Sequence, residues 1–156
     1  MSAKLIKCYL YSAGIVLLIS GLAKVISGSG NAKILGTPDP IFNVSFRYMF
    51  TIVGALEIGI GMGCILGKNL GWRATVLTWL STSFFLYRIG LLWVGYRQPC
   101  HCLGDLSGAL HISPYAADNA MKLALGYLLL GSYATLFWLH RQKRIIPPAR
   151  GHWGRS

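Results

Sequence analysis

Cys100 and Cys102, separated by a single residue, are the side chains of this chain best suited to chemistry. They can form a disulfide only if the backbone turns, because the two Cα atoms must lie within about 4.4–6.8 Å. Pro99 before them and Gly104 after them favour such a turn. Closing so small a ring strains the disulfide, and strained, exposed disulfides exchange readily with thiols. The spacing therefore predicts a redox-active pair.

Two neighbouring side chains bear on the same chemistry. His101 and Arg97 can favour the thiolate form of the cysteines, which is the nucleophile in thiol–disulfide exchange. A metal site is a second interpretation, with His101, His111 and the two thiols as ligands. Closed zinc sites normally use spaced pairs of ligands, however, so we expect no metal here. A static disulfide is the third interpretation, although closing so short a loop would add little stability.

The composition indicates a membrane protein of one domain. Of the 156 residues, 54 % are apolar and 12 % are charged, whereas about 25 % are charged in a typical soluble domain. The net charge is +11, with four acidic residues in all. The basic residues stand at the ends of apolar runs rather than in a cluster, which is typical of membrane proteins and argues against nucleic-acid binding.

The apolar runs predict an all-α fold, an integral membrane four-helix bundle within residues 1–140. Each run is close to the about 20 residues that cross a bilayer. Residues 97–117 form the longest polar break and hold the cysteine pair, and residues 141–156 are expected to be a basic, disordered tail. The predicted spans are Leu5–Ile26, Phe46–Leu66, Trp72–Tyr96 and Asp118–Leu139.

Counting basic residues gives an orientation. Cytoplasmic loops carry an excess of Lys and Arg, so we expect both termini and the turn at Lys68 to be cytoplasmic. The cysteine loop is then expected on the periplasmic side of a bacterial inner membrane, where disulfides persist. The basic residues counted inside are Lys4, Lys7, Lys68, Arg73, Arg141, Lys143, Arg144, Arg150 and Arg155.

Three charged residues fall within the predicted spans: Glu57, Arg88 and Lys24. Glu57 and Arg88 lie at similar depths, roughly 16 and 12 Å from the outer helix ends by helical rise. We therefore expect them to pair in the bundle interior, either as a structural ion pair or as a site for protons or a quinone carbonyl. Lys24 lies near the outer interface, where we expect it to extend toward water.

Small residues and the other two cysteines are assigned to packing. Residues Ala55, Gly59, Gly63 and Gly67 recur every four positions, which predicts a smooth groove for a neighbouring helix. A second line of small residues comprises Ala116, Ala120 and Ala124. Cys8 and Cys64 are expected to be buried as small apolar fillers.

Three of these motifs resemble a known family. The segment from Ser20 to Val25 resembles the Gly-x-x-Lys-hydrophobic signature of DoxX-like membrane proteins, and that from Ala55 to Gly61 resembles their acidic, glycine-rich second helix. Pro99-Cys100-His101-Cys102-Leu103-Gly104 is similar to the Pro-Cys-x-Cys-hydrophobic-Gly loop of the MauE branch, the methylamine-utilisation membrane proteins. The resemblance implies a four-helix bundle in the inner membrane that helps a periplasmic partner to acquire its disulfides.

The residues and the resemblance together favour a thiol–disulfide oxidoreductase as the first hypothesis. Cys100 and Cys102 would exchange with a periplasmic thioredoxin-like or disulfide-containing client, with a quinone near Glu57 and Arg88 as the electron carrier. The alternatives are a non-enzymatic accessory subunit that docks a periplasmic enzyme, and a carrier of a metal or small molecule. A homodimer is left open.

Overall fold

The fold is all-helical, as predicted. The computed structural model describes residues 3–30, 33–95 and 113–145. Helices α1 (Ala3–Gly28), α2 (Phe46–Leu66), α3 (Leu70–Trp93) and α5 (Pro114–Ile145) form a bundle, with a short 3-10 helix, η1 (Lys33–Gly36), between α1 and α2. The second helix has the predicted bounds. Helix α5 continues beyond the predicted span, so the first five residues of the expected tail are helical.

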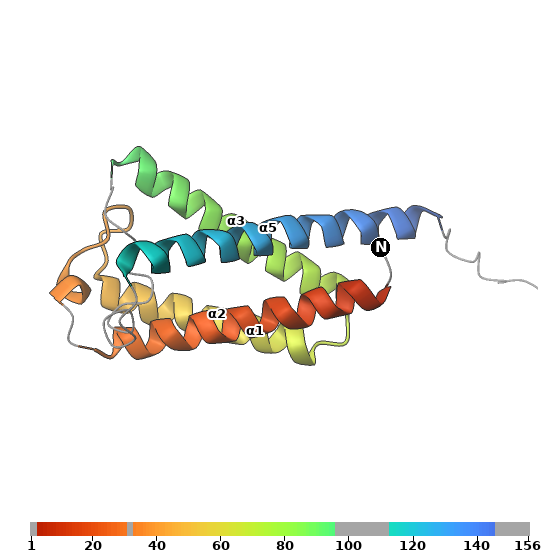
Figure 1. The fold of residues 1–156 in the computed structure, drawn as a ribbon, viewed down its shortest axis with the longest axis horizontal. Helices are drawn as coiled ribbons and strands as arrows, with labels where there is room; N and C mark the ends of the chain where they lie inside the picture. Colours follow the sequence, from red (N-terminus) through yellow and green to blue (C-terminus); the bar gives the residue numbers. More distant parts are fainter. Residues whose placement is uncertain (1–2, 31–32, 96–112, 146–156) are drawn as a thin grey trace, which may run out of the picture.

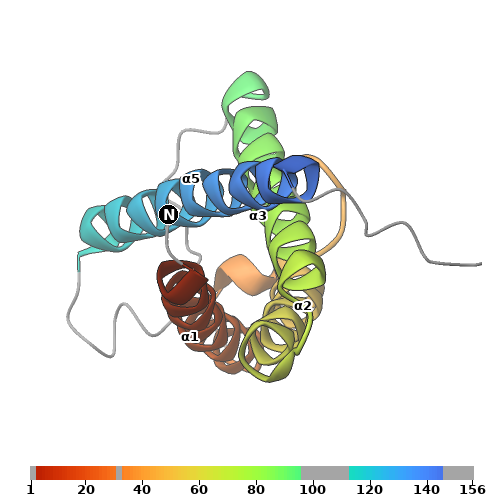
Figure 2. The same cartoon turned by 90° about the vertical axis from the view of Figure 1, so that its right-hand side faces the viewer.

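The helices run up and down the bundle, so that successive helices are antiparallel (Figure 1). One end of the bundle, called here the loop end, holds the end of α3 and the start of α5, which flank residues 96–112. The opposite end, the distal end, holds the start of α1 and the end of α5. Viewed along the bundle, α1 and α2 form one pair, and α3 and α5 cross as a second pair (Figure 2).

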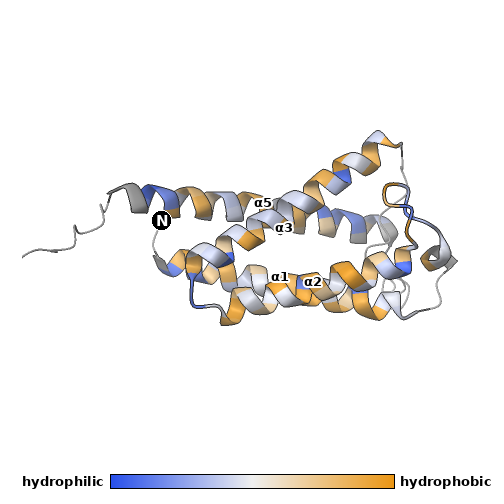
Figure 3. Cartoon of the chain, turned by 180° about the vertical axis from the view of Figure 1, so that it is seen from behind, coloured by the Kyte–Doolittle hydropathy of each residue, from blue (hydrophilic) through white to orange (hydrophobic). Residues whose placement is uncertain are grey.

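All four long helices are long and apolar enough to cross a membrane, within residues 4–28, 46–66, 70–93 and 118–142. Large apolar side chains cover their outer faces: Ile19, Leu66, Leu92 and Leu130 are each more than 60 % exposed. Figure 3 shows the apolar colouring that runs along the helices. An outer surface of this kind is stable in lipid rather than in water, and the chain is a multi-pass membrane protein.

Helices α1 and α2 pack through two reciprocal pairs of glycines. A Cβ atom on Gly21 would lie 2.7 Å from the carbonyl oxygen of Gly54, and one on Gly54 would lie 2.8 Å from that of Gly21. Gly14 and Gly61 form the second pair, at 3.0 and 2.9 Å. Each pair lies seven residues from the other on both helices, so the two backbones stay in close contact over two turns.

The predicted glycine seam of α2 is therefore on the wrong face. A Cβ atom on Gly59 would meet no other atom within 4 Å, so this position lies open to the bundle exterior, as does the exposed Ala55. Gly63 faces the indole of Trp72 on α3 instead, which a Cβ atom on Gly63 would approach to 3.2 Å. The four-residue repeat drifts around a helix of 3.6 residues per turn, whereas the seven-residue spacing of Gly54 and Gly61 stays on one face.

A regular apolar stripe on α1 forms the core. Ile6, Leu10, Ala13 and Leu17 recur at spacings of four and three residues, and each is at most 1 % exposed. Helix α5 is attached to this stripe partly through polar side chains. The Tyr9 hydroxyl donates to the carbonyl of Leu128 at 2.9 Å. Between α3 and α5, the hydroxyls of Ser81 and Ser132 lie 3.3 Å apart. The membrane interior thus contains hydroxyl contacts that fix helix positions.

Candidate functional site

A buried ion pair joins α1 to α2. The ammonium Nζ of Lys24 lies 2.8 Å from both carboxylate oxygens of Glu57, and it donates a third hydrogen bond to the Ser20 hydroxyl at 2.6 Å. The ring of Phe84 on α3 lies 5.9 Å from the ammonium, close enough for a cation–π contact. Lys24 and Glu57 are 6 % and 1 % exposed. All three ammonium protons are used, so the pair is complete as it stands.

This geometry contradicts two predictions. Glu57 does not pair with Arg88, and Lys24 does not extend to the outer interface. The reason is the register of α1 against α2. The first turn of α2 projects past the end of α1, since Gly28 at that end packs against Thr51. Lys24 then lies opposite Gly54, inside the bundle and within reach of Glu57.

The sequence did contain a signal for this pair. Lys24 follows Leu17 by seven residues, as Leu17 follows Leu10, so it continues the buried stripe of α1. Glu57 precedes the buried Cys64 by seven residues on α2. A seven-residue repeat keeps side chains on one face of a packed helix, so both charges fall on interior faces.

Arg88 belongs to a second cluster, between α3 and α5 near the loop end. Its guanidinium lies 2.9 Å from the carboxylate of Asp118. The Lys122 ammonium lies 2.6 Å from the other oxygen of the same carboxylate, one turn along α5. Lys122 is mostly exposed, whereas Asp118 is largely buried. The cluster links the last turns of α3 to the first turns of α5, the two helices that flank the cysteine segment.

A third acidic residue, Asp39, is buried in the connection between α1 and α2. One carboxylate oxygen accepts the backbone N–H groups of Ile41 and Phe42, at 2.8 and 3.0 Å. The other accepts a short hydrogen bond from the Tyr87 hydroxyl on α3. The Tyr87 ring also stacks on Phe42, with centroids 6.0 Å apart. These contacts hold the connection against α3 at the loop end.

The contacts of Asp39 with the backbone and with Tyr87 were not predicted from the sequence. Asp39 stands between two prolines, where an Asp side chain commonly bonds the backbone two residues on. That pattern predicts the local turn. The contact with Tyr87, 48 residues later, depends on tertiary packing and left no local signal.

The two cysteines outside the loop differ in environment. Cys64 is buried in the core, as predicted, but Cys8 is exposed on the outer face of α1, so the prediction of a buried Cys8 is wrong. Nearby, the buried Arg73 of α3 donates to the carbonyl of Gly67 at 3.1 Å. Its guanidinium also lies 5.1 Å from the Tyr11 ring. A cation at the carboxyl end of α2 is favourable because backbone carbonyls are unpaired there.

The predicted reactive residues Arg97, Cys100, His101 and Cys102 lie outside the described residues, as does His111. The described helices determine only where this segment begins and ends, at the loop end of α3 and of α5. Within residues 3–30, 33–95 and 113–145, no three His, Cys, Asp or Glu side chains gather as a metal site. The metal interpretation of the cysteine segment is not tested by this.

The fold and these contacts define a class: a small four-helix membrane protein with buried ion pairs at Glu57 and Asp118 and with a cysteine segment that joins α3 to α5 in the sequence. Residues 2–139 match the family described as methylamine utilisation protein MauE. The chain belongs to this family, and the predicted resemblance to MauE is confirmed. The comparison with curated proteins and the comparison with solved structures each found no match. The likeness to DoxX stays a prediction.

Proposed function

We propose that this chain is an inner-membrane thiol–disulfide oxidoreductase whose reactive pair is Cys100 and Cys102. In the exchange, a thiolate of a client protein attacks the Cys100–Cys102 disulfide and forms a mixed disulfide. The second client thiolate then displaces the bound cysteine, which leaves a client disulfide and two reduced cysteines. Two electrons and two protons thus pass from the client to the pair. Re-oxidation requires an acceptor, and a membrane quinone, reduced to quinol, is the class we propose.

One observation carries the proposal most strongly: the Cys-x-Cys segment follows a helix that is held at the loop end on two sides. Tyr87 bonds the connection before α2, and the adjacent Arg88 bonds Asp118 on α5. The entry and exit of the cysteine segment are therefore tied to the bundle. Exchange depends on presenting a sulfur to a partner in a defined place, which a tied frame favours over a free tail.

The expected quinone site at Glu57 and Arg88 is revised accordingly. Lys24 and Glu57 occupy each other's hydrogen-bonding groups, so neither is free for a quinone carbonyl. Arg88 is partly exposed, at 24 % of its side chain, and lies toward the loop end. We therefore propose that a quinone ring, when bound, lies on the Arg88 side, toward the loop end.

Trapping of mixed disulfides tests the proposal. Cys102→Ser is expected to accumulate a disulfide between Cys100 and a client, visible on a non-reducing gel. In the reverse direction of the exchange, the Cys100 thiolate attacks the disulfide of an oxidised client and releases one client thiol, and no Cys102 thiol remains to displace the client. The double variant Cys100→Ser/Cys102→Ser is expected to lose the species. Cys8→Ser, on the outer face of α1, is the matched control and should trap as the parent does. A trapped species that survives loss of both loop cysteines would refute the exchange.

A second function is favoured by the family description. A methylamine utilisation protein can also act as an accessory subunit that docks a periplasmic enzyme without exchanging electrons. Maturation of the partner would then survive the double cysteine variant and fail when α1 and α2 separate. The double cysteine variant separates these alternatives. The exchange proposal predicts failure in it and in Gly54→Leu, which lies at the closest approach of the α1 and α2 backbones, whereas the accessory role predicts failure in Gly54→Leu alone.

A further inference from the structure

The two ends of the bundle differ in where acidic side chains accompany the basic ones. The three acidic residues that the structure describes, Asp39, Glu57 and Asp118, lie in the middle or toward the loop end and are all engaged. The distal end holds basic side chains without an acidic neighbour among the described residues. Exposed ones are Lys7 on α1, Lys68 before the start of α3, and Arg141 on α5. A cationic, acid-free membrane surface attracts anionic lipid.

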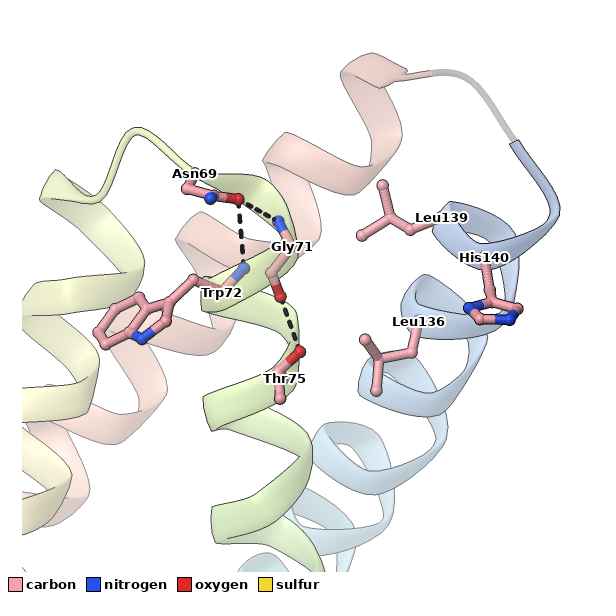
Figure 4. A pocket seen from close by; sticks show the side chains of 7 residues that line it. All are labelled: Asn69, Gly71, Trp72, Thr75, Leu136, Leu139 and His140. Atoms are coloured by element: carbon pink, nitrogen blue, oxygen red, sulfur yellow. Dashed lines mark hydrogen bonds between the residues drawn. The ribbon is translucent and has the colours of Figure 1, made fainter. Parts of the chain in front are cut away.

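A crevice opens at this end between α3 and α5 (Figure 4). Its volume is about 330 Å³, at the lower end of the range for ligand pockets. Figure 4 shows Leu136 and Leu139 of α5 directed toward α3, with Thr75 of α3 across from them. Asn69 lies at the top of the view, and His140 lies on α5 between the heights of Leu139 and Leu136. The crevice thus has an apolar part, and Asn69 and His140 form its polar rim.

Its position matches the level of lipid headgroups. Residues 69–75 cover the start of the third span and residues 136–140 the end of the fourth. Two basic residues adjoin the rim in sequence, Lys68 before Asn69 and Arg141 after His140. Both are exposed, and in the described part of the chain neither forms an ion pair with a carboxylate. The Arg141 guanidinium contacts only a ring, that of Phe137, at 5.0 Å.

The polar rim retains hydrogen-bonding capacity. The Asn69 side-chain oxygen caps α3 by accepting the backbone N–H groups of Gly71 and Trp72, at 3.0 and 3.3 Å. Its amide nitrogen and the His140 imidazole have no partner among the described residues. Both can donate to phosphate oxygens.

We propose that this crevice binds one anionic phospholipid, with the phosphate held at the rim by Asn69, His140 and their basic neighbours. The upper part of an acyl chain then lies against Leu136, Leu139 and Thr75. A quinone fits this position less well. The crevice and the end of α3 are separated by about twenty residues, or roughly 30 Å of helix, which is too far from the cysteine segment for direct exchange.

Native mass spectrometry of the full-length protein in detergent tests the site. Phosphatidylglycerol and phosphatidylcholine with the same acyl chains are added at equal concentration. One basic side chain near a membrane surface contributes about 1 kcal/mol toward anionic lipid, so the singly bound species should favour phosphatidylglycerol by about five-fold. Equal retention of the two lipids would overturn the proposal, because ordinary boundary lipid gives that result.

Two variants locate the lipid. Thr75→Phe fills the crevice and should remove the preference, while Ser83→Phe, two turns along the same helix, should keep it. The hydroxyls of Thr75 and Ser83 each donate to the backbone carbonyl four residues earlier, so both substitutions remove the same kind of hydrogen bond. If Thr75→Phe fails to fold, His140→Leu combined with Lys68→Gln changes only the exposed rim and should reduce the preference. A preference unchanged by these variants, or displacement of the lipid by a short-chain quinone, would refute the assignment.

Discussion

The buried pair of Lys24 and Glu57 gives the sharpest prediction of stability. Glu57→Ala leaves an ammonium in the bundle interior with the Ser20 hydroxyl as its remaining hydrogen-bond partner. Removing one partner of a buried ion pair costs about 3–5 kcal/mol. Lys24→Ala leaves a buried carboxylate and is expected to cost a similar amount. Each variant should lower the free energy of unfolding by about that much.

Replacing both partners should behave differently. Lys24→Met/Glu57→Leu removes the two charges and fills the space with apolar groups. Exchanging a buried pair for well-packed apolar residues is often neutral or stabilising by about 1–4 kcal/mol. The double variant should therefore be at least as stable as the parent. The double-mutant cycle, completed with the single variants Lys24→Met and Glu57→Leu, should give a coupling of several kcal/mol.

The assay is reversible unfolding of the purified protein in mixed detergent micelles. Arg88→Ala is the matched control. Asp118 keeps the Lys122 ammonium when Arg88 is removed, so the loss should be nearer 1 kcal/mol, as for a partly exposed pair. If the free-energy losses of the two single variants simply add up in the double variant, the two charges are not coupled. That result, or a Glu57→Ala variant as stable as the parent, would refute the inference that the buried charges stabilise each other.

The same variants separate a structural role from proton delivery. A stable Lys24→Met/Glu57→Leu protein that still traps the client through Cys100 assigns the pair to helix packing. Loss of trapping in a protein that unfolds normally assigns the pair to the reaction, because both of its titratable groups would be gone. Circular dichroism alongside the trapping gel distinguishes these outcomes from misfolding.

Two further predictions concern packing. Gly54→Leu should destabilise the bundle by about 3 kcal/mol or more, because its side chain would meet the backbone of α1. Gly59→Leu on the open face should change the unfolding midpoint little. Equal effects in the two variants would contradict the observed packing of α1 against α2. Tyr87→Phe should lower the free energy of unfolding by about 1–3 kcal/mol, because the Asp39 carboxylate loses a hydrogen-bond donor. Tyr48→Phe, at an exposed tyrosine, is the control. Thermal unfolding measures both variants.

The sequence predicted the helices and their order because hydrophobic length is a local property. The second span was predicted to the residue, since Ser45 and Gly67 mark its ends. The pairing of charges could not be predicted from depth alone. Depth was measured from expected helix ends, and a shift of one turn between α1 and α2 was enough to exchange Arg88 for Lys24 as the partner of Glu57.

Long-range partners were beyond sequence reasoning for a related reason. The Asp39–Tyr87 contact joins a loop to a helix, and the Arg88–Asp118 contact spans the cysteine segment. In each case the sequence shows two residues that could pair, but whether they lie close together depends on how α3 crosses the bundle. Periodicity could have identified interior faces, because seven-residue spacing relates Lys24 to Leu17 and Glu57 to Cys64.

The distribution of charge gives the bundle a direction that is independent of the cysteine segment. Acidic residues at the loop end bond Tyr87, Arg88 and Lys122, and the Asp39 and Asp118 carboxylates thereby join α3 to the α1–α2 connection and to α5. At the distal end, exposed basic residues are left for the membrane surface. The inner leaflet of a bacterial membrane is the anionic surface that basic segments face under the positive-inside rule. The proposed lipid selectivity at the distal crevice and the proposed periplasmic access of the cysteine loop both follow from one expected orientation. A membrane-impermeant thiol reagent that failed to reach reduced Cys100 or Cys102 in intact cells would refute that orientation.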